Sequence, residues 1–204
     1  MTNRAKYIRW FETLGSKDVH LVGGKNASLG EMIHSLKKEG IRVPDGFATT
    51  SDAYWSLLDA AHLVEKVEEL LDEFERDERS LEKVGRAIRG LFLKAEFPEA
   101  LSGAIGKAYA ELCQRYRTDD VDVAVRSSAT AEDLPEASFA GQQESFLNIS
   151  GEEELLEACR RCYASLFTDR AIAYRKEKGF DHMKVALSVG DQKMVRSDEA
   201  GAGV

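Results

Sequence analysis

Apolar residues recur every three to four positions through roughly the first half of this 204-residue chain, which is the spacing of amphipathic helices. The first such set ends near Gly40, a residue type that favours the C-terminal end of a helix. Thr49 to Ser51 offer N-cap candidates for the second helix, and Pro98 suits the first position of the fifth. The pattern predicts five helices, over residues 29–40, 51–58, 64–74, 81–92 and 98–112.

The period changes to two after residue 120. Val121, Val123 and Val125 alternate with other residues, which predicts a strand, and residues 185–189 predict another. Helix spacing returns over two stretches between them, and Thr168 is a cap candidate for the second of these helices. The remaining predicted elements are a hairpin at 138–149 and helices at 155–166 and 168–179. We therefore expect a mixed α+β fold with a helix-rich first half and a small, mostly antiparallel sheet.

Composition and charge narrow the function classes. Hydrophobic residues make up 43% and charged residues 31%, as in ordinary globular proteins, which excludes a disordered tail or a disulfide scaffold. The 28 basic and 36 acidic residues give a net charge of −8, which argues against a duplex nucleic acid partner. No apolar run reaches membrane-span length, and the first residues lack the apolar region of a signal peptide, so we expect a cytoplasmic protein with no membrane partner.

One glycine-containing segment could bind an anion. Gly23 and Gly24 precede Lys25 at the mouth of a predicted helix, where free backbone N–H groups and the helix dipole favour phosphate. The segment is not a Walker A loop, because it lacks that motif's spacing. The alternative interpretation is a plain glycine turn with a solvated lysine, and from these residues alone both stay open.

Two further segments could contribute to such a site. Arg126 follows a buried-looking strand, and a rigidly presented guanidinium suits phosphate oxygens; the alternative is a salt bridge at a sheet edge. Gly141 lies among small and polar residues that resemble a hairpin lid over phosphates, although an ordinary hairpin fits equally well.

The cysteines and histidines do not suggest a metal site. Cys159 and Cys162 form a Cys-x-x-Cys pair, but both lie on the apolar stripe of a predicted helix and no second pair supplies the other zinc ligands. With Cys113 they make an odd number, so we expect reduced, buried thiols. The four histidines are scattered without ligand spacing.

Taken together, these motifs resemble the N-terminal nucleotide-binding region of the phosphoenolpyruvate synthase (pyruvate, water dikinase) family. The resemblance extends from about residue 10 to residue 204 and keeps the order of the motifs. Pyruvate phosphate dikinases and rifampin phosphotransferases share a looser version. The matching segments are 22–32 (VGGKNASLGEM), 43–50 (VPDGFATT), 125–133 (VRSSATAED), 137–144 (ASFAGQQE), 164–171 (ASLFTDRA) and 192–198 (QKMVRSD).

The resemblance implies an ATP-grasp-like fold that holds ATP between two lobes. It implies two groups of ligand-binding residues and Mg²⁺ as a cofactor whose ligands are expected outside this chain. Those expected to bind the ATP phosphates are Lys25, Arg126, Gly141, Gln142 and Ser145. Those expected on the adenine side are Gln192, Met194 and Val195. Asp191 departs from the family pattern, in which an apolar residue is usual.

The resemblance also implies how much of the enzyme this chain holds. We expect residues 1–183 to form the first lobe and residues 184–204 to begin a second, truncated one. Family members pass a phosphoryl group from ATP through a histidine to pyruvate, on domains expected outside this chain, so no catalytic residue is predicted here. The chain alone should not complete the reaction. A non-catalytic nucleotide-binding or interaction module, and a lobe of an enzyme resembling rifampin phosphotransferase, stay open as alternatives; the sequence does not indicate whether the chain forms a homo-oligomer.

Overall fold

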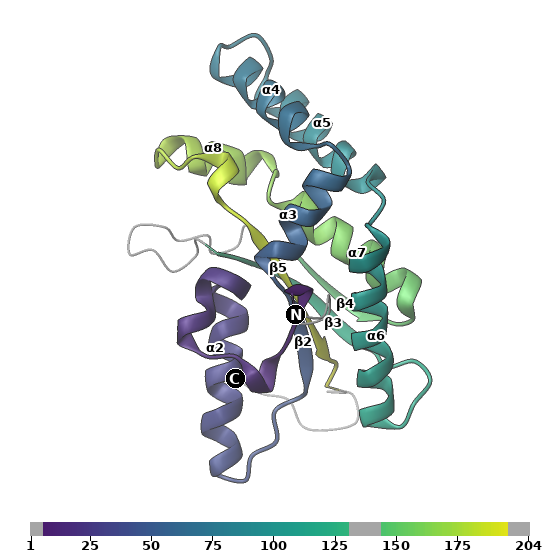
Figure 1. The fold of residues 1–204 in the computed structure, drawn as a ribbon. Coiled ribbons are helices and arrows are strands. Elements are labelled where there is room, and N and C mark those ends of the chain that lie inside the picture. Colours follow the sequence, from purple (N-terminus) through teal and green to yellow (C-terminus); the bar gives the residue numbers. More distant parts are fainter. Residues whose placement is uncertain (1–5, 131–143, 196–204) are drawn as a thin grey trace.

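A five-stranded sheet runs through the middle of the molecule, and every neighbouring pair of strands is antiparallel (Figure 1). The computed structural model describes residues 6–130 and 144–195. The strand order is β1-β2-β5-β3-β4, so the last strand of the described chain lies at the centre. The strands are β1 (Ile8–Trp10), β2 (Gly46–Thr49), β3 (Val123–Ala129), β4 (Ser145–Ile149) and β5 (Leu187–Lys193).

The helices account for most of the rest of the described chain. Three short 3-10 helices, η1 (Phe11–Thr13), η2 (Ser16–Asp18) and η3 (His182–Lys184), join the longer elements. The α-helices are α2 (Val19–Lys38), α3 (Ser51–Ala60), α4 (Val64–Glu75), α5 (Leu81–Lys94), α6 (Glu99–Tyr116), α7 (Glu152–Ser165) and α8 (Asp169–Glu177). The mixed α+β fold with a helix-rich first half and a small antiparallel sheet is therefore confirmed.

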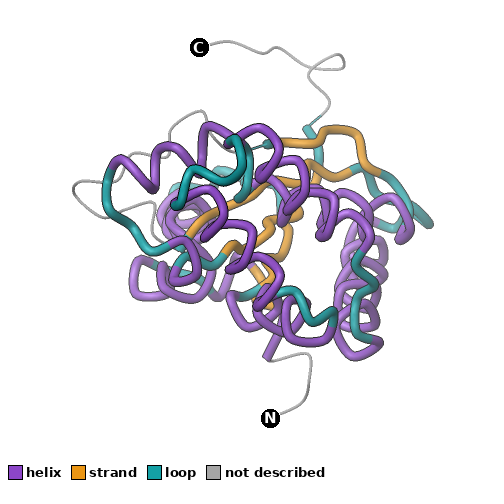
Figure 2. The backbone as a smooth tube through the Cα atoms, turned by 90° about the horizontal axis from the view of Figure 1, so that it is seen from above, coloured by secondary structure: helices purple, strands orange, loops and turns teal. Residues whose placement is uncertain are grey.

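The helices cover the two faces of the sheet unequally, and from above the strands lie between them (Figure 2). Helix α2 packs on one face against a small apolar cluster that includes Phe11, Val22 and Ala48. The opposite face carries the main core, which draws on α3, α6 and α7 and includes Phe47 and Val125. The two cores follow from the alternation of side chains along each strand.

Most predicted helices lie where their periodicity placed them. Helix α2 begins ten residues earlier than predicted, at Val19. Pro98 takes the N-cap position of α6 and not its first helical position, and the Thr168 hydroxyl accepts a hydrogen bond from the Ala171 amide at 3.3 Å, which confirms that cap. Strands β1 and β2 were not predicted, because three or four residues are too few to show a period of two.

The hairpin predicted at 138–149 is described only from residue 144. Its last five residues form β4, which pairs with β3. Strand β5 pairs with both β2 and β3. Strands that come before and after residue 184 in the sequence therefore belong to the same sheet. The division into lobes at that residue stays a prediction. Among the described residues, no helix combines the length and apolar character needed to cross a membrane.

Candidate functional site

A break in helix α2 lies beside the first predicted phosphate ligand. Gly23 has φ 74° and ψ 165°, so the helix is interrupted there and restarts just before Lys25. A side chain at Gly23 would collide with Ser128 of β3, with its Cβ 2.6 Å from the Ser128 carbonyl oxygen. Glycine therefore lets the restarted helix approach the sheet closely, and the exposed side chain of Lys25 lies in the first turn of that segment.

Arg126 is the one exposed residue within the otherwise buried strand β3. It lies two residues before Ser128, which faces α2, and alternate residues of a strand point to the same side. Arg126 therefore projects on the α2 face of the sheet. The Nζ atom of Lys25 lies 3.4 Å from the carbonyl oxygen of Ser127, the next residue along the strand. Two cations from segments far apart in the sequence thus meet at one place.

Ser145 joins these cations through the register of the sheet. It begins β4 and is the pairing partner of Arg126, whose partner on the other side is Gly190 of β5. A side chain at Gly190 would clash with Asn26 of α2, which donates through Nδ2 to the Ser188 hydroxyl at 2.9 Å. This hydrogen bond anchors the start of α2 to the centre of the sheet. The other predicted phosphate ligands, Gly141 and Gln142, lie outside the described residues.

The predicted adenine-side residues lie at the end of β5. The Gln192 side chain donates through Nε2 to the Pro44 carbonyl oxygen at 3.2 Å, and the Met194 amide donates to the Asp122 carbonyl oxygen at 2.8 Å. Met194 and Val195 line a cavity of about 520 Å³. Its other walls come from the second half of α2, the loop before β2 and the end of α6.

Helix α2 connects the two groups of predicted ligands. Lys25 lies at the end near Arg126, and Lys37 lines the cavity that contains Met194. Twelve helical residues span about 18 Å at 1.5 Å per residue. A ligand that touches both groups must therefore be elongated.

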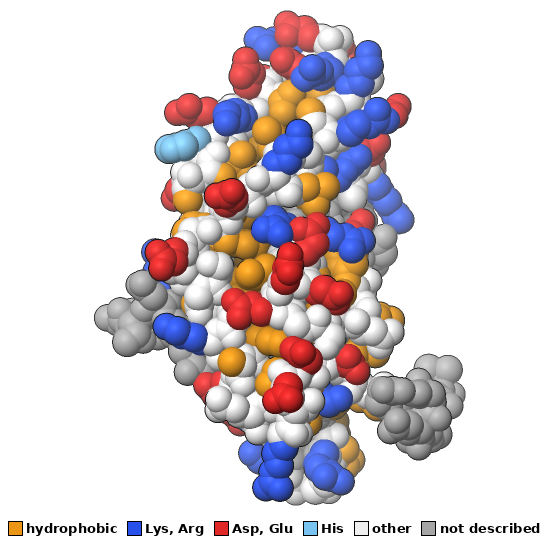
Figure 3. Space-filling model, turned by 90° about the vertical axis from the view of Figure 1, so that its right-hand side faces the viewer, with side chains coloured by type: hydrophobic (Ala, Val, Ile, Leu, Met, Phe, Trp, Pro, Cys, Tyr) orange, Lys and Arg blue, Asp and Glu red, His pale blue; other side chains and the backbone are white. Residues whose placement is uncertain are grey.

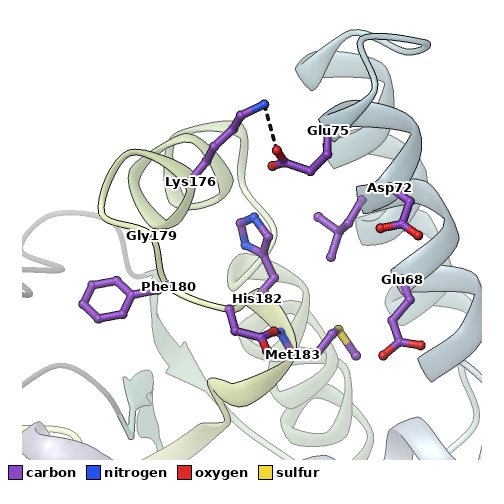
Figure 4. A pocket seen from close by; sticks show the side chains of 10 residues that line it. Glu68, Asp72, Glu75, Lys176, Gly179, Phe180, His182 and Met183 are labelled. Carbon is purple, nitrogen blue, oxygen red and sulfur yellow. Dashed lines mark hydrogen bonds and ion pairs between the residues drawn. The ribbon is translucent and has the colours of Figure 1, made fainter.

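A second cavity, of about 630 Å³, lies between α4 and the segment that follows α8 (Figure 4). Glu68 and Asp72 line one side, His182 projects from the other, and Lys176 pairs with Glu75 at 3.2 Å. Burial and the nearby Arg175 lower the pKa of His182 to about 4, so the ring is neutral near pH 7. None of the predicted ligands within the described residues lines this cavity.

Three polar side chains with unusual surroundings were not assigned a role from the sequence. Asp191 is fully buried, and neither carboxyl oxygen has a hydrogen-bond partner among the described residues. Arg175 is also fully buried, and burial lowers its pKa to about 10. Arg115 contacts several acidic side chains. Asp191 interrupts an apolar run, which was a usable signal, but no periodicity distinguishes the two arginines.

The described residues do not offer a conventional metal site. No group of three or more His, Cys, Asp or Glu side chains among them could hold a metal ion. Cys113, Cys159 and Cys162 are reduced and buried, as predicted. On the face that turns away from α2, acidic and basic side chains are interspersed (Figure 3).

Comparison with known proteins agrees with this geometry. Residues 19–204 match the family model described as the pyruvate phosphate dikinase AMP/ATP-binding domain. The chain is 55% identical to phosphoenolpyruvate synthase of Helicobacter pylori, 56% to that of Synechocystis sp. and 50% to that of Escherichia coli, with 97–98% of the chain aligned each time. It spans about 25% of the length of each of these relatives.

Proposed function

The chain belongs to the family of the pyruvate phosphate dikinase AMP/ATP-binding domain, and from this premise we propose that it is the ATP-binding part of an enzyme that forms phosphoenolpyruvate from pyruvate. One observation carries the proposal beyond family membership. Lys25 and Arg126, about a hundred residues apart, converge on one face of the sheet beside the start of a helix. Such a convergence of cations at the start of a helical segment suits a polyphosphate.

Each group of residues has a separate task in this proposal. Lys25, Arg126 and Ser145 bind the phosphates, together with Gly141 and Gln142. Gln192, Met194 and Val195 hold the adenine. ATP supplies the phosphoryl group, and the contribution of this chain is to bind and orient it, because positioning and charge neutralisation dominate catalysis of phosphoryl transfer.

The rest of the reaction belongs to the longer enzyme in this proposal. Residues 1–183 form the first lobe of an ATP-grasp-like domain, and residues 184–204 begin the second. Mg²⁺ is held by side chains outside this chain, and pyruvate is bound by other domains. The net charge of −8 argues against a nucleic acid partner, and we place the enzyme in the cytoplasm.

Binding of ATP by the 204-residue chain tests the phosphate site directly. Lys25→Ala and Arg126→Ala each remove a charge-assisted contact that contributes about 1.5–3 kcal/mol, so each should weaken ATP binding about tenfold or more in calorimetric titrations. Lys83→Ala and Arg86→Ala are matched controls, because both side chains are exposed on α5. Affinities in the Lys25 and Arg126 variants equal to that of the wild type would contradict the site.

A chimaera tests the enzymatic part of the proposal. The chain can replace the matching quarter of Escherichia coli phosphoenolpyruvate synthase, to which it is 50% identical. We expect pyruvate-dependent formation of AMP and phosphoenolpyruvate by the chimaera, and loss of both products in its Lys25→Ala form. ATP binding without any activity in the chimaera would favour the alternative, a nucleotide-binding module without catalysis.

A further inference from the structure

Arg115 joins three acidic side chains at the edge of the cavity that Met194 and Val195 line. It projects from the last turn of α6, and its guanidinium lies over the Trp10 ring, with Cζ 3.6 Å from the ring centroid. Its Nη1 atom pairs with Asp45 and, at 3.2 Å, with Glu12. Its Nη2 atom pairs with Glu111 at 3.0 Å. One side chain thereby links α6, β1, η1 and the loop before β2.

The loop that Arg115 holds is bonded directly to the segment predicted to contact the base. The Asp45 carbonyl oxygen accepts a hydrogen bond from the Lys193 amide at 2.9 Å. Pro44, the residue before Asp45, accepts one from the Gln192 side chain at 3.2 Å. The amide of Asp45 donates to the Tyr116 hydroxyl at 3.0 Å, which attaches the loop to α6 a second time. The position of residues 192–195 therefore depends on the position of this loop.

The alternative is that Arg115 forms an ordinary surface ion pair. Isolated, exposed ion pairs contribute little, because two mobile side chains must be ordered in high-dielectric solvent. Arg115 differs from such a pair in two respects. Its side chain is only 30% exposed, and its planar guanidinium lies over the Trp10 ring while both Nη atoms bind carboxylates. A fork held in this way fixes the carboxylate of Asp45 in one place.

We propose that Arg115 is a positioning residue for the nucleobase, acting through Asp45 to hold the backbone of residues 192–195 against which the base lies. This inference rests on the proposed function. The inference assigns Arg115 to the base end of the site alone. Arg115 contacts β1, η1 and the loop before β2, whereas the predicted phosphate ligands Lys25 and Arg126 lie on the α2 face.

Two ligands distinguish the base end from the phosphate end. We would measure the affinity of the 204-residue chain for ATP and for inorganic tripolyphosphate, which has no base. In Arg115→Met, the affinity for ATP should fall about threefold to tenfold, the range expected for a coupled contact, while the affinity for tripolyphosphate should stay within about twofold. Arg86→Met is the matched control, because Arg86 is exposed on α5 and pairs with Glu82 one helical turn away.

A double-mutant cycle tests whether Arg115 acts through Asp45. Asp45→Asn should weaken ATP binding about as much as Arg115→Met, and the double variant should lose little more, because both changes release the same loop. Arg115→Lys keeps the charge without the planar fork, so it should lie between the wild type and Arg115→Met and remains available if the Met variant does not fold.

The outcomes are distinct for the two proposals. Unchanged ATP affinity in Arg115→Met, an equal loss for tripolyphosphate, or additive losses in the cycle would each overturn the role of Arg115 while leaving ATP binding by the wild type intact. A wild-type chain that binds neither ligand would overturn the proposed function itself, and the inference with it.

Discussion

Asp191 should make the protein less stable as the pH rises. Its carboxyl group lies in the central strand β5, between its pairing partners Val125 and Phe47 and on the side of the main core. The groups that face it from α7 are the thiols of Cys159 and Cys162 and the phenol of Tyr163, and none of them is a cation. Burial therefore raises the pKa of Asp191 well above its usual range.

The direction and slope of the effect follow from proton linkage. The unfolded chain releases the Asp191 proton near pH 4, whereas the folded chain keeps it to a higher pH. Between the two pKa values the folded state binds more protons, so the free energy of unfolding decreases by about 1.4 kcal/mol per pH unit. For a chain of this size, 1 kcal/mol corresponds to about 2–4 °C in Tm.

The measurement compares Asp191→Asn with the wild type by thermal unfolding at several pH values from 5 upwards. Asparagine has nearly the same shape but does not titrate, so its Tm advantage should grow by about 3–5 °C per pH unit until the folded-state pKa is reached. Asp119→Asn is the matched control, because it makes the same replacement at an exposed position. Parallel Tm curves for the Asp191 variant and the wild type would refute the reasoning.

Three further predictions concern the backbone, a helix cap and the thiols. Gly23→Ala should lower the free energy of unfolding by about 2 kcal/mol or more in denaturant titrations, because φ is positive and the added Cβ meets Ser128; an effect below 0.5 kcal/mol would contradict the close approach of α2. Thr168→Ala should cost about 1 kcal/mol in the same titrations through loss of the α8 cap, whereas Thr118→Ala, at an exposed loop position, should cost less. Cys159 and Cys162 should react with a thiol reagent at pH 7 only after unfolding, because burial raises the pKa of both thiols well above its usual range; rapid labelling of the folded chain would show that they are accessible.

The helices were predictable because each carries its own apolar stripe. Helices α4 and α5 end within two residues of the periodic pattern, since their contacts lie mainly along one face. Strands β1 and β2 were not predictable, because their three and four residues are defined by pairing with distant strands. The early start of α2 at Val19 was hidden by Gly23, which ends one helical segment and begins another across a kink.

The candidate site was likewise predictable from the sequence only in part. Lys25 was identified because it follows two glycines and Arg126 because it follows a buried-looking strand, but their convergence depends on the register between β3 and β5 and on the docking of α2. Arg115 has no local signal, because its partners Glu12 and Asp45 are 103 and 70 residues away in the sequence. A side chain that acts through the loop before β2 can be recognised only once the position of that loop in the fold is known.

The alternation of side chains along β5 places the main core on one face of the strand and the proposed ligand site on the other. Gly190 faces Asn26 and the start of α2, whereas Val189 and Asp191 lie on the side of the main core. The proposed binding face can carry a residue as small as Gly190 because the opposite face supplies the packing that holds the strand in place. A buried carboxyl at Asp191 weakens that packing without placing a charge in the site, and the effect of Arg115 reaches the same strand only at its end, through Asp45 and Lys193. Changes at Asp191 should therefore alter unfolding, and changes at Arg115 should alter ligand binding, although both act on β5.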